Sequence, residues 1–411
     1  MREYLLTLLA AAAVSYLLTP LVRRAAIRIG AVPEIRDRDV HAVRTPSLGG
    51  LAMYGGLAAG LLVASQLPIM RGVLAGKSAV SLLLAGALVV AAGVVDDRWG
   101  MNATSKLAAQ VAASGILVWG GVELAWLPAP KSTVVLSPNQ GAVLTILLVV
   151  VTINAVNFID GLDGLAAGIV GISAFAFFIY SYEITRMAGF QSHLTLPALS
   201  SAVLTGMCAG FLPHNFFPAR IFMGDTGAML IGLVLAYGPV ASSDNLDPST
   251  LTHVNRFPAI LPLLIPVLIL LIPYADLILA VVRRTRAGLP WNAADKKHLH
   301  HRLLEIGHSH RQSVLIMYGW AGLFAFAVVM LGVVRSPLIV FSVATLAAAL
   351  ALVLVSMPRL RPAWLAGRGR GYRRQVRSGS SPTANSHRAH ISHRSRDTQP
   401  QQPATGPSAK V

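Results

Sequence analysis

The sequence predicts an all-α polytopic integral membrane protein with about eleven transmembrane helices. The chain has 411 residues, of which 54% are hydrophobic and only 12% are charged, and its mean hydropathy is +0.62. A soluble domain carries about 25% charged residues. Apolar segments of about 20 residues, the length that spans the hydrocarbon core of a bilayer, recur along the chain. The single cysteine, Cys208, lies in one of these segments and excludes an intrachain disulfide.

The expected spans follow one another with short connections, and the fourth is the shortest of them. The first is expected to be a retained helix, because it runs directly into Arg23 and Arg24 without a small-residue cleavage pattern. The spans are 4–22, 47–66, 78–95, 107–122, 140–157, 165–182, 196–213, 226–243, 257–282, 314–333 and 337–356.

The distribution of basic residues predicts the orientation of these spans. Of the 34 Lys and Arg residues, 27 fall in the C-terminal tail or in the connections that follow spans one, three, five, seven and nine. Basic residues accumulate on the cytoplasmic side of a membrane. We therefore expect a multi-pass protein of the cell membrane with its N-terminus outside and its C-terminus in the cytoplasm.

The C-terminal segment 357–411 differs from the membrane body 1–356. It is rich in Arg, Ser, Pro, Gln and His, and its one acid is Asp397. Such a composition predicts a disordered cytoplasmic tail. Its positive charge suits anionic lipid headgroups, at about 1 kcal/mol per basic residue near the surface. No nucleic-acid-binding fold is visible, so we expect membrane lipids and no nucleic acid as its partners.

Acidic residues gather where predicted helices meet the cytoplasm. A carboxylate at membrane depth costs about 2.5–3.5 kcal/mol, so it usually faces a partner or a water-filled cavity. One such acid could be a helix cap, but six acids at four helix junctions on one face are hard to explain as caps. They are Asp96, Asp97, Asp160, Asp163, Asp225 and Asp276.

Two of these junctions leave alternatives open. Asp96 and Asp97 are adjacent, so on a helix their side chains would point about 100° apart. One could serve chemistry and the other a metal, or both could begin a solvated loop. Asp225 lies between glycines in IFMGDTGAML, where Asp is suited to an N-cap. The same position is suited to an anion site beside a carboxylate that holds a divalent ion.

Histidine and basic residues form the second chemical signal. Three histidines within four residues, in DKKHLHHRL, lack the i, i+4 spacing of a helical zinc site, and no cysteine is near. With the neighbouring basic residues they resemble a phosphate or sugar-phosphate clamp, and the alternative is a basic interfacial loop. The first connection, RDRDVHAVRTPSLGG, mixes acids, His41 and Arg44 in a similar way. The candidate clamp residues are His298, His300, His301 and Arg302.

These groups together predict an enzyme that joins a water-soluble phosphate ester to a lipid. Mg²⁺ is typically held by one or two carboxylates plus substrate phosphates, and phosphoryl transfer needs positioning and charge neutralisation above all. A transporter is the main alternative class. It would place its acids near the midplane, in matching broken segments of two halves, whereas here the acids lie at one face and the halves do not match. No GxxxxGK[ST] or strand-associated GxGxxG motif indicates an ATPase or a dinucleotide site.

An ordered set of motifs on alternate connections carries a resemblance to a known family. DVHAVRTPSLGG, GVVDDRWG, NAVNFIDGLDGLA, IFMGDTG and DKKHLHHRL follow one another in this order. The set resembles the polyprenyl-phosphate N-acetylhexosamine-1-phosphate transferases, over residues 1 to about 356. The resemblance implies that a sugar 1-phosphate moves from a UDP-sugar to a polyprenyl phosphate, with Mg²⁺ (or Mn²⁺) and release of UMP. It also implies an active cleft at the cytoplasmic face.

The resemblance assigns roles to individual residues. The NxxNxxDGxDG loop at the mouth of the cleft falls on Asn154, Asn157, Asp160 and Asp163, where the two aspartates are expected to be catalytic and the two asparagines to bind substrate. The metal-binding aspartate falls on Asp225, the adjacent acidic pair on Asp96 and Asp97, and the basic partner of that pair on Lys106. We expect Asp96 or Asp97 to accept a proton from the lipid phosphate or to position it. A direct attack by the lipid phosphate is the simpler route, and a covalent aspartyl intermediate is the alternative.

Two branches of the family differ in their sugar. The HLHHRL form and Asp276 ahead of Arg283 and Arg284 resemble the branch that uses UDP-N-acetylglucosamine, and the alternative is the UDP-MurNAc-pentapeptide branch. Many members carry a third Asp where this chain has Gly100, which is a departure from the pattern. The Arg-rich tail and the DDRWG form resemble actinobacterial members, which leaves decaprenyl and undecaprenyl phosphate open as the acceptor. A homodimer through terminal helices is compatible with the resemblance.

Overall fold

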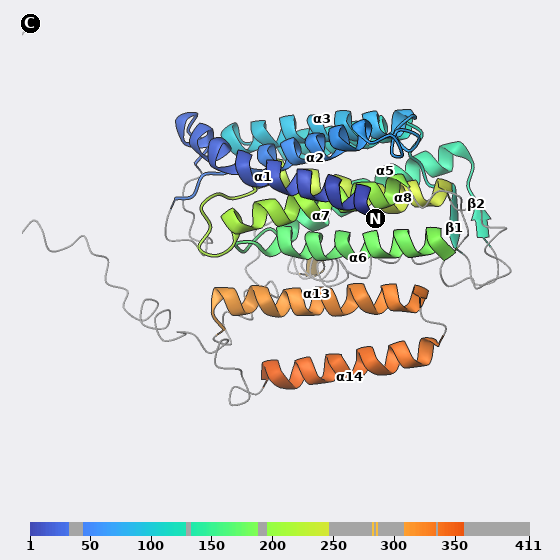
Figure 1. The fold of residues 1–411 in the computed structure, drawn as a ribbon. Coiled ribbons are helices and arrows are strands. Elements are labelled where there is room, and N and C mark those ends of the chain that lie inside the picture. Colours follow the sequence, from blue (N-terminus) through green and yellow to red (C-terminus); the bar gives the residue numbers. More distant parts are fainter. Residues whose placement is uncertain are drawn as a thin grey trace, which may run out of the picture. The chain divides into compact units, whose positions relative to one another are not determined.

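The computed structural model of the chain describes residues 1–32, 44–128, 133–187, 195–245, 282, 285–286, 308–333 and 336–356. Within these residues the protein is a bundle of long α-helices with one short β-hairpin (Figure 1). The helices are α1 (Arg2–Arg28), α2 (Gly49–Gln66), α3 (Lys77–Trp99), α4 (Ala103–Trp119), α5 (Pro138–Ile159), α6 (Leu165–Met187), α7 (Leu196–Asn215), α8 (Gly224–Asn245), α13 (His310–Val333) and α14 (Pro337–Ser356). The hairpin pairs β1 (Trp126–Pro128) with β2 (Thr133–Val135) in antiparallel register.

The prediction of a helical polytopic membrane protein is confirmed. Seven of the described helices are long and apolar enough to cross a membrane. Ten of the eleven expected spans overlap a described helix. The hairpin was not predicted. The ninth expected span, apart from Val282, and the expected tail lie outside the described residues.

The helices run further toward one end of the bundle than the apolar segments alone predict. The third span was expected to stop at residue 95, but α3 continues to Trp99 and includes Asp96 and Asp97 in its last turn. The fourth was expected to start at residue 107, but α4 starts at Ala103 and carries Lys106 in its first turns. The interpretation of Asp96 and Asp97 as the start of a solvated loop is therefore wrong, because backbone hydrogen bonding extends the helix past its apolar part.

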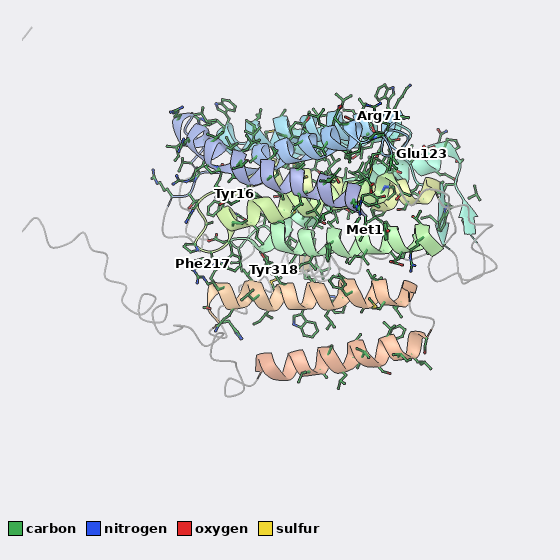
Figure 2. All side chains as sticks on the ribbon, viewed as in Figure 1. Met1, Tyr16, Arg71, Glu123, Phe217 and Tyr318 are labelled. Carbon is green, nitrogen blue, oxygen red and sulfur yellow. The ribbon has the colours of Figure 1, made fainter. Side chains whose placement is uncertain are left out.

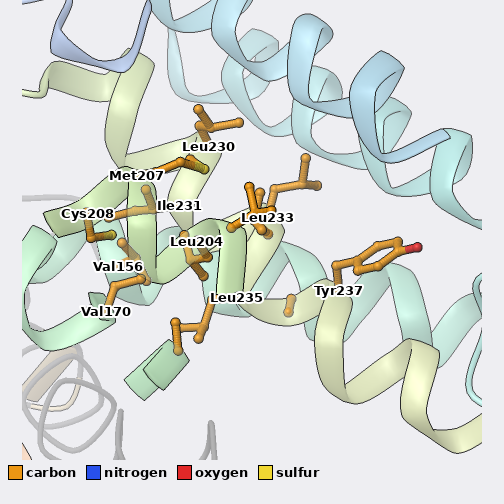
Figure 3. Packing of buried hydrophobic residues seen from close by; sticks show 14 of the residues in the cluster. Val156, Val170, Leu204, Met207, Cys208, Leu230, Ile231, Leu233, Leu235 and Tyr237 are labelled. Carbon is orange, nitrogen blue, oxygen red and sulfur yellow. The ribbon is translucent and has the colours of Figure 1, made fainter. Parts of the chain in front are cut away.

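Helix α8 lies at the centre of the bundle, where α2, α3, α5 and α7 all pack against it. Its membrane-spanning part is buried on every side. Figure 3 shows Leu230 and Ile231 of α8 in one cluster with Val156 of α5, Val170 of α6 and Leu204 of α7. A helix that is apolar all round belongs in such an interior position.

Glycines let two helices touch the first turns of α8 directly. A Cβ atom at Gly50 of α2 would overlap the backbone of Gly227, and a Cβ atom at Gly93 of α3 would overlap the backbone of Thr226. Small residues commonly permit such close approach between membrane helices. The contact fixes α2 and α3 against the end of α8 that begins at Gly224.

Hydrogen bonds join the helix ends on the same side of the bundle. Arg98 donates from Nε to the Ile29 carbonyl at 2.6 Å, and the Phe222 N–H donates to the Pro46 carbonyl at 2.9 Å. At the opposite end, Trp126 Nε1 donates to the Ser243 carbonyl at 2.9 Å. Figure 2 shows Met1, Arg71 and Glu123 toward this opposite end, far from Phe217.

The helices therefore alternate in direction. One end of the bundle holds the predicted acids. The helices that finish at this end are α1, α3, α5 and α7, and those that begin there are α2, α4, α6 and α8. Helix α13 also begins at that end, because Arg311 donates from Nε to the Phe217 carbonyl at 3.2 Å. Helix α8 finishes at the other end, beside Trp126.

Large apolar side chains cover the outer surfaces of the first and last described helices. Leu17 of α1 is 66% exposed and Leu338 of α14 is 78% exposed. In water such surfaces would be unfavourable, at about 25 cal/mol per Å² of apolar area. A lipid environment removes this cost, so the exposed leucines agree with a membrane-spanning bundle.

The alternation generates a topology prediction. A cysteine introduced at Ser309 should be labelled by a membrane-impermeant maleimide from the cytoplasmic side, and one at Asn245 from the outside. The only native cysteine, Cys208, is buried, so Cys208→Ser gives a silent background. Labelling of both positions from the same side would contradict the alternation.

Candidate active site

The first turn of α8 is held by a carboxylate from α3. Asp97 Oδ1 accepts a hydrogen bond from the Asp225 N–H at 3.0 Å. Its Oδ2 accepts from the Thr226 N–H at 3.2 Å and from the Thr226 hydroxyl at 2.6 Å. The N–H groups at the start of a helix have no partner within the helix, and here Asp97 supplies it. The N–H groups of Asp225 and Thr226 are thus taken, so the structure does not support the anion-site interpretation of these two groups.

Lys106 joins two of the predicted acids from different helices. Its ammonium lies 2.7 Å from Asp96 Oδ2 and 2.6 Å from Asp225 Oδ2. The three side chains are largely buried, with Lys106 20% exposed, Asp96 10% and Asp225 24%. The interpretation of Lys106 as the basic partner of the acidic pair agrees with this geometry, although it is Asp96 and not Asp97 that it contacts.

The turn between α3 and α4 sets the place of Lys106. Asp96 Oδ1 accepts from the Met101 N–H at 2.7 Å, and Asn102 caps α4 by accepting from the Ser105 N–H at 2.7 Å. Gly100 between them has φ +78° and ψ 139°. Residues with a Cβ atom rarely adopt this conformation. An aspartate substituted at this position would therefore strain the turn as this chain forms it.

Asp160 lies in the connection after α5, among the other acids. Part of the residue surface remains exposed, while its carboxyl group is enclosed by protein, and the pKa of Asp160 rises from 3.8 to about 8. Burial is the main cause, and the negative charges of Asp225, Asp97 and Asp163 add to it. Asp160 is thus protonated at neutral pH unless a cation offsets these charges.

Asp163 has a structural part in the same connection. The side chain is buried, and its Oδ2 accepts from the Ala219 N–H at 3.0 Å. Its own N–H donates to His310 Nε2 of α13 at 3.1 Å. The His310 ring stacks on Phe217, with ring centroids 4.5 Å apart. Asp163 therefore ties the connection to residues 217–219 and to α13, and its catalytic role stays a prediction.

The two predicted asparagines lie on the last turns of α5. Asn154 donates from Nδ2 to Gln110 Oε1 of α4 at 2.7 Å and to the Val150 carbonyl at 2.8 Å. Gln110 is buried. Asn157 is half-buried, one turn nearer to Asp160. Part of the Asn154 amide thus serves the contact between α4 and α5.

The donors in this region fit a hard divalent cation. Carboxylate and amide oxygens are the ligands that Mg²⁺ prefers, usually one or two carboxylates completed by substrate phosphates and water. Within the described residues no group of three His, Cys, Asp or Glu side chains is arranged to enclose a metal. Asp225, the predicted metal-binding aspartate, offers one such carboxylate at the start of α8.

Several predicted residues cannot be placed. His41, His298, His300, His301 and Arg302 lie outside the described residues. Conversely, the structure adds Thr226, Gln110, His310 and Asn215, which donates from Nδ2 to the Ile221 carbonyl at 3.0 Å and accepts from the Gly164 N–H at 3.1 Å. Thr226 could have been suspected from its place beside Asp225. Gln110 is a polar residue within an apolar segment, which is the kind of signal that could have identified it.

Comparisons with known proteins agree on one family. The model of glycosyl transferase family 4 matches residues 79–243. The chain is 44% identical over 330 residues to a decaprenyl-phosphate N-acetylglucosaminephosphotransferase of Mycolicibacterium smegmatis, covering 79% of this chain and 81% of that protein. It is 31% identical over 316 residues to a probable undecaprenyl-phosphate N-acetylglucosaminyl 1-phosphate transferase of Bacillus subtilis, covering 77% of this chain and 81% of that protein. A phospho-N-acetylmuramoyl-pentapeptide-transferase of M. smegmatis is 35% identical over 263 residues, covering 55% of this chain and 72% of that protein.

The raised pKa of Asp160 predicts a pH dependence of stability. Between pH 3.8 and about 8 the folded protein holds a proton that the unfolded chain releases. The free energy of unfolding must therefore fall as pH rises through this window. Thermal unfolding in detergent with EDTA should show a drop in Tm toward pH 8 that is smaller in Asp160→Asn. Asp244→Asn, at the other end of α8, is the control, and equal slopes in all three proteins would refute the assignment.

Proposed function

The chain belongs to the polyprenyl-phosphate N-acetylhexosamine-1-phosphate transferase family, and on this premise we propose that it transfers N-acetylglucosamine 1-phosphate from UDP-N-acetylglucosamine to a polyprenyl phosphate. One observation carries the proposal. The motif residues Asp96, Lys106 and Asp225 come from three helices and meet as one ion-paired cluster at one end of the membrane bundle. Asp160 lies near enough for its pKa to respond to the charge of Asp225.

The proposed acceptor follows from the membrane-spanning body and from the activities for which the relatives are named. The M. smegmatis relative is named for decaprenyl phosphate and the B. subtilis relative for undecaprenyl phosphate. Both are long isoprenoid chains with one phosphate. A membrane-spanning body with its polar cluster at one end of the helices suits such a substrate, because the chain can stay in lipid while the phosphate reaches the cluster.

The mechanism needs the two phosphate-bearing substrates to approach a cluster of acids. Lys106 contributes a positive charge held between Asp96 and Asp225. We expect it to orient an incoming phosphate and to offset part of its charge. Mg²⁺, held by Asp225 and by the substrate, would supply the remaining neutralisation of charge on the leaving UMP. Mn²⁺ has similar ligand preferences and could replace it.

The bond changes are those of a direct displacement. An oxygen of the lipid phosphate forms a bond to the β-phosphorus of the UDP-sugar, and the bond from that phosphorus to the bridging oxygen breaks. UMP leaves with that oxygen. A phosphate monoester has a second pKa of about 6 and is mostly ionised near neutral pH, so the attacking oxygen needs little help from a protein base.

The proposal includes the cellular setting. The basic residues predict that the polar cluster faces the cytoplasm, where UDP-sugars are made, within a multi-pass protein of the cell membrane. A homodimer through the terminal helices stays a prediction of the family resemblance. The exposed apolar face of α14 is compatible with either lipid or a second copy.

The donor is tested by direct competition of substrates. Purified protein with polyprenyl phosphate and Mg²⁺ should release UMP from UDP-N-acetylglucosamine faster than from UDP-MurNAc-pentapeptide. The expectation rests on sequence similarity, because the chain is 44% identical over 330 residues to the M. smegmatis N-acetylglucosamine relative and 35% identical over 263 residues to the muramoyl relative. Coupled detection of UMP measures both rates. A faster reaction with the muramoyl donor would place the protein in the other branch.

The metal role of Asp225 is tested by substitution and by metal removal. Asp225→Asn should lower kcat by several orders of magnitude, because one charged ligand is lost and Lys106 loses one of its two partners. EDTA should abolish UMP release by the unsubstituted protein, and added Mg²⁺ should restore it. Asp244→Asn is the same chemical change at the opposite end of the same helix and should leave the rate within about twofold of normal. Near-normal turnover of Asp225→Asn would remove this residue from the site.

A further inference from the structure

The cap on α8 comes from a distant part of the chain. Met223, the residue before the helix, has no side-chain oxygen to serve as a cap, and the helix begins at Gly224. The φ of +67° at Gly224 is a conformation that other residues rarely adopt, and a Cβ atom there would overlap the Asp97 carboxylate. The capping acceptor is instead Asp97, which lies 128 residues before Asp225 in the chain.

Both oxygens of Asp97 are engaged by this cap. They receive three hydrogen bonds, of which two come from the backbone and one from the buried hydroxyl of Thr226. A carboxylate held in this way is directed at the protein backbone. The neighbouring Asp96 is directed instead at Lys106. The adjacent pair thus divides into one acid that faces the charged cluster and one that faces the start of α8.

We propose that Asp97 and Thr226 are positioning residues, which fix the backbone of Asp225 so that its carboxylate is aimed at Lys106 and at the cation-bound phosphates. The part of this proposal that concerns turnover rests on the proposed function. The part that concerns cation binding does not. This positioning role for Asp97 replaces the expectation that Asp97 accepts a proton from the lipid phosphate.

The surrounding packing makes this positioning stiff. Gly93 lies one helical turn before Asp97 on the same face of α3, and its Cα approaches the backbone of Thr226 so closely that a Cβ atom would overlap it. Asp225 is thus held by its N–H through Asp97 and by its side chain through Lys106. Loss of either the hydrogen bond to Asp97 or the ion pair with Lys106 would let the Asp225 carboxylate turn away from the cluster.

The test removes one hydrogen bond while keeping the shape of the site. Thr226→Val deletes the hydroxyl that donates to Asp97, Thr226→Ser restores it, and Asp97→Asn keeps the shape of Asp97 but replaces one acceptor by an NH₂ group. Thr185→Val is the matched control, because Thr185 is a buried threonine of α6 whose hydroxyl donates within its own helix, to the Ser181 carbonyl at 2.7 Å.

Two quantities are measured on each purified protein in detergent. The first is binding of Mn²⁺, used in place of Mg²⁺ and followed by the EPR signal of the free ion, with and without UDP-N-acetylglucosamine. The second is kcat and KM for UMP release. A lost hydrogen bond to a charged group should weaken Mn²⁺ binding and lower kcat by about tenfold to a hundredfold in Thr226→Val and Asp97→Asn. KM for the lipid should change by less than about threefold, and Thr226→Ser and Thr185→Val should stay near the unsubstituted protein.

The measurements distinguish failure of the positioning role from failure of the proposed function. Unchanged Mn²⁺ affinity in both Thr226→Val and Asp97→Asn overturns the proposal, whatever their turnover, and loss of turnover in Asp97→Asn alone would make Asp97 a catalytic residue. Absence of Mn²⁺ binding to the unsubstituted protein overturns it as well. If the unsubstituted protein releases no UMP from any donor, the proposed function fails, but the Mn²⁺ measurements still decide the role of Asp97 and Thr226. If Thr226→Val does not fold, Thr226→Ala removes the same hydroxyl and takes its place.

Discussion

The structure depends on how a helix can begin in the interior of a membrane protein. The first N–H groups of a helix have no partner within it, and α2 and α3 pack directly against the start of α8, so the partner must come from the protein. Asp97 satisfies two of these groups on α8, and Gly50 and Gly93 allow α2 and α3 to close around the same turn. The most deeply buried helix of the described bundle therefore starts at a fixed place, and the acid in its first turn is fixed with it.

This arrangement joins fold stability to the chemistry of the site. The carboxylate of Asp225 is held to Lys106, and Lys106 to Asp96, so three helices are linked through the charged cluster. A pair of buried charges is costly to separate, because the remaining charge has no compensation. The same charges are poorly balanced among themselves, as the raised pKa of Asp160 indicates. A divalent cation bound there would offset this negative charge as two phosphates approach, which is the physical argument for the metal proposed above.

The connection between α5 and α6 is held by hydrogen bonds between side chains and the backbone. Asp163 and Asn215 hold the connection after α5 against residues 217–221, and His310 brings the start of α13 to the same place. These contacts use backbone N–H and carbonyl groups, so they fix the path of the chain beside Asp160. Within this connection Asp163 fixes the backbone, and Asp160 lies beside the charged cluster.

The sequence by itself determined the membrane character, most of the spans and the identity of the acids, because apolar length and the high cost of a buried charge act locally and can be read residue by residue. It also carried the family motifs in their order, including Asp225 and Lys106. The tertiary structure alone decided the division between Asp96 and Asp97, the contact of Asn154 with Gln110 and the parts played by Thr226 and His310. These depend on which helices approach one another, and the close approach is made by glycines whose partners lie more than a hundred residues away in the chain. The direction of a carboxylate is set by the donors around it, and those donors are brought together only when the chain folds.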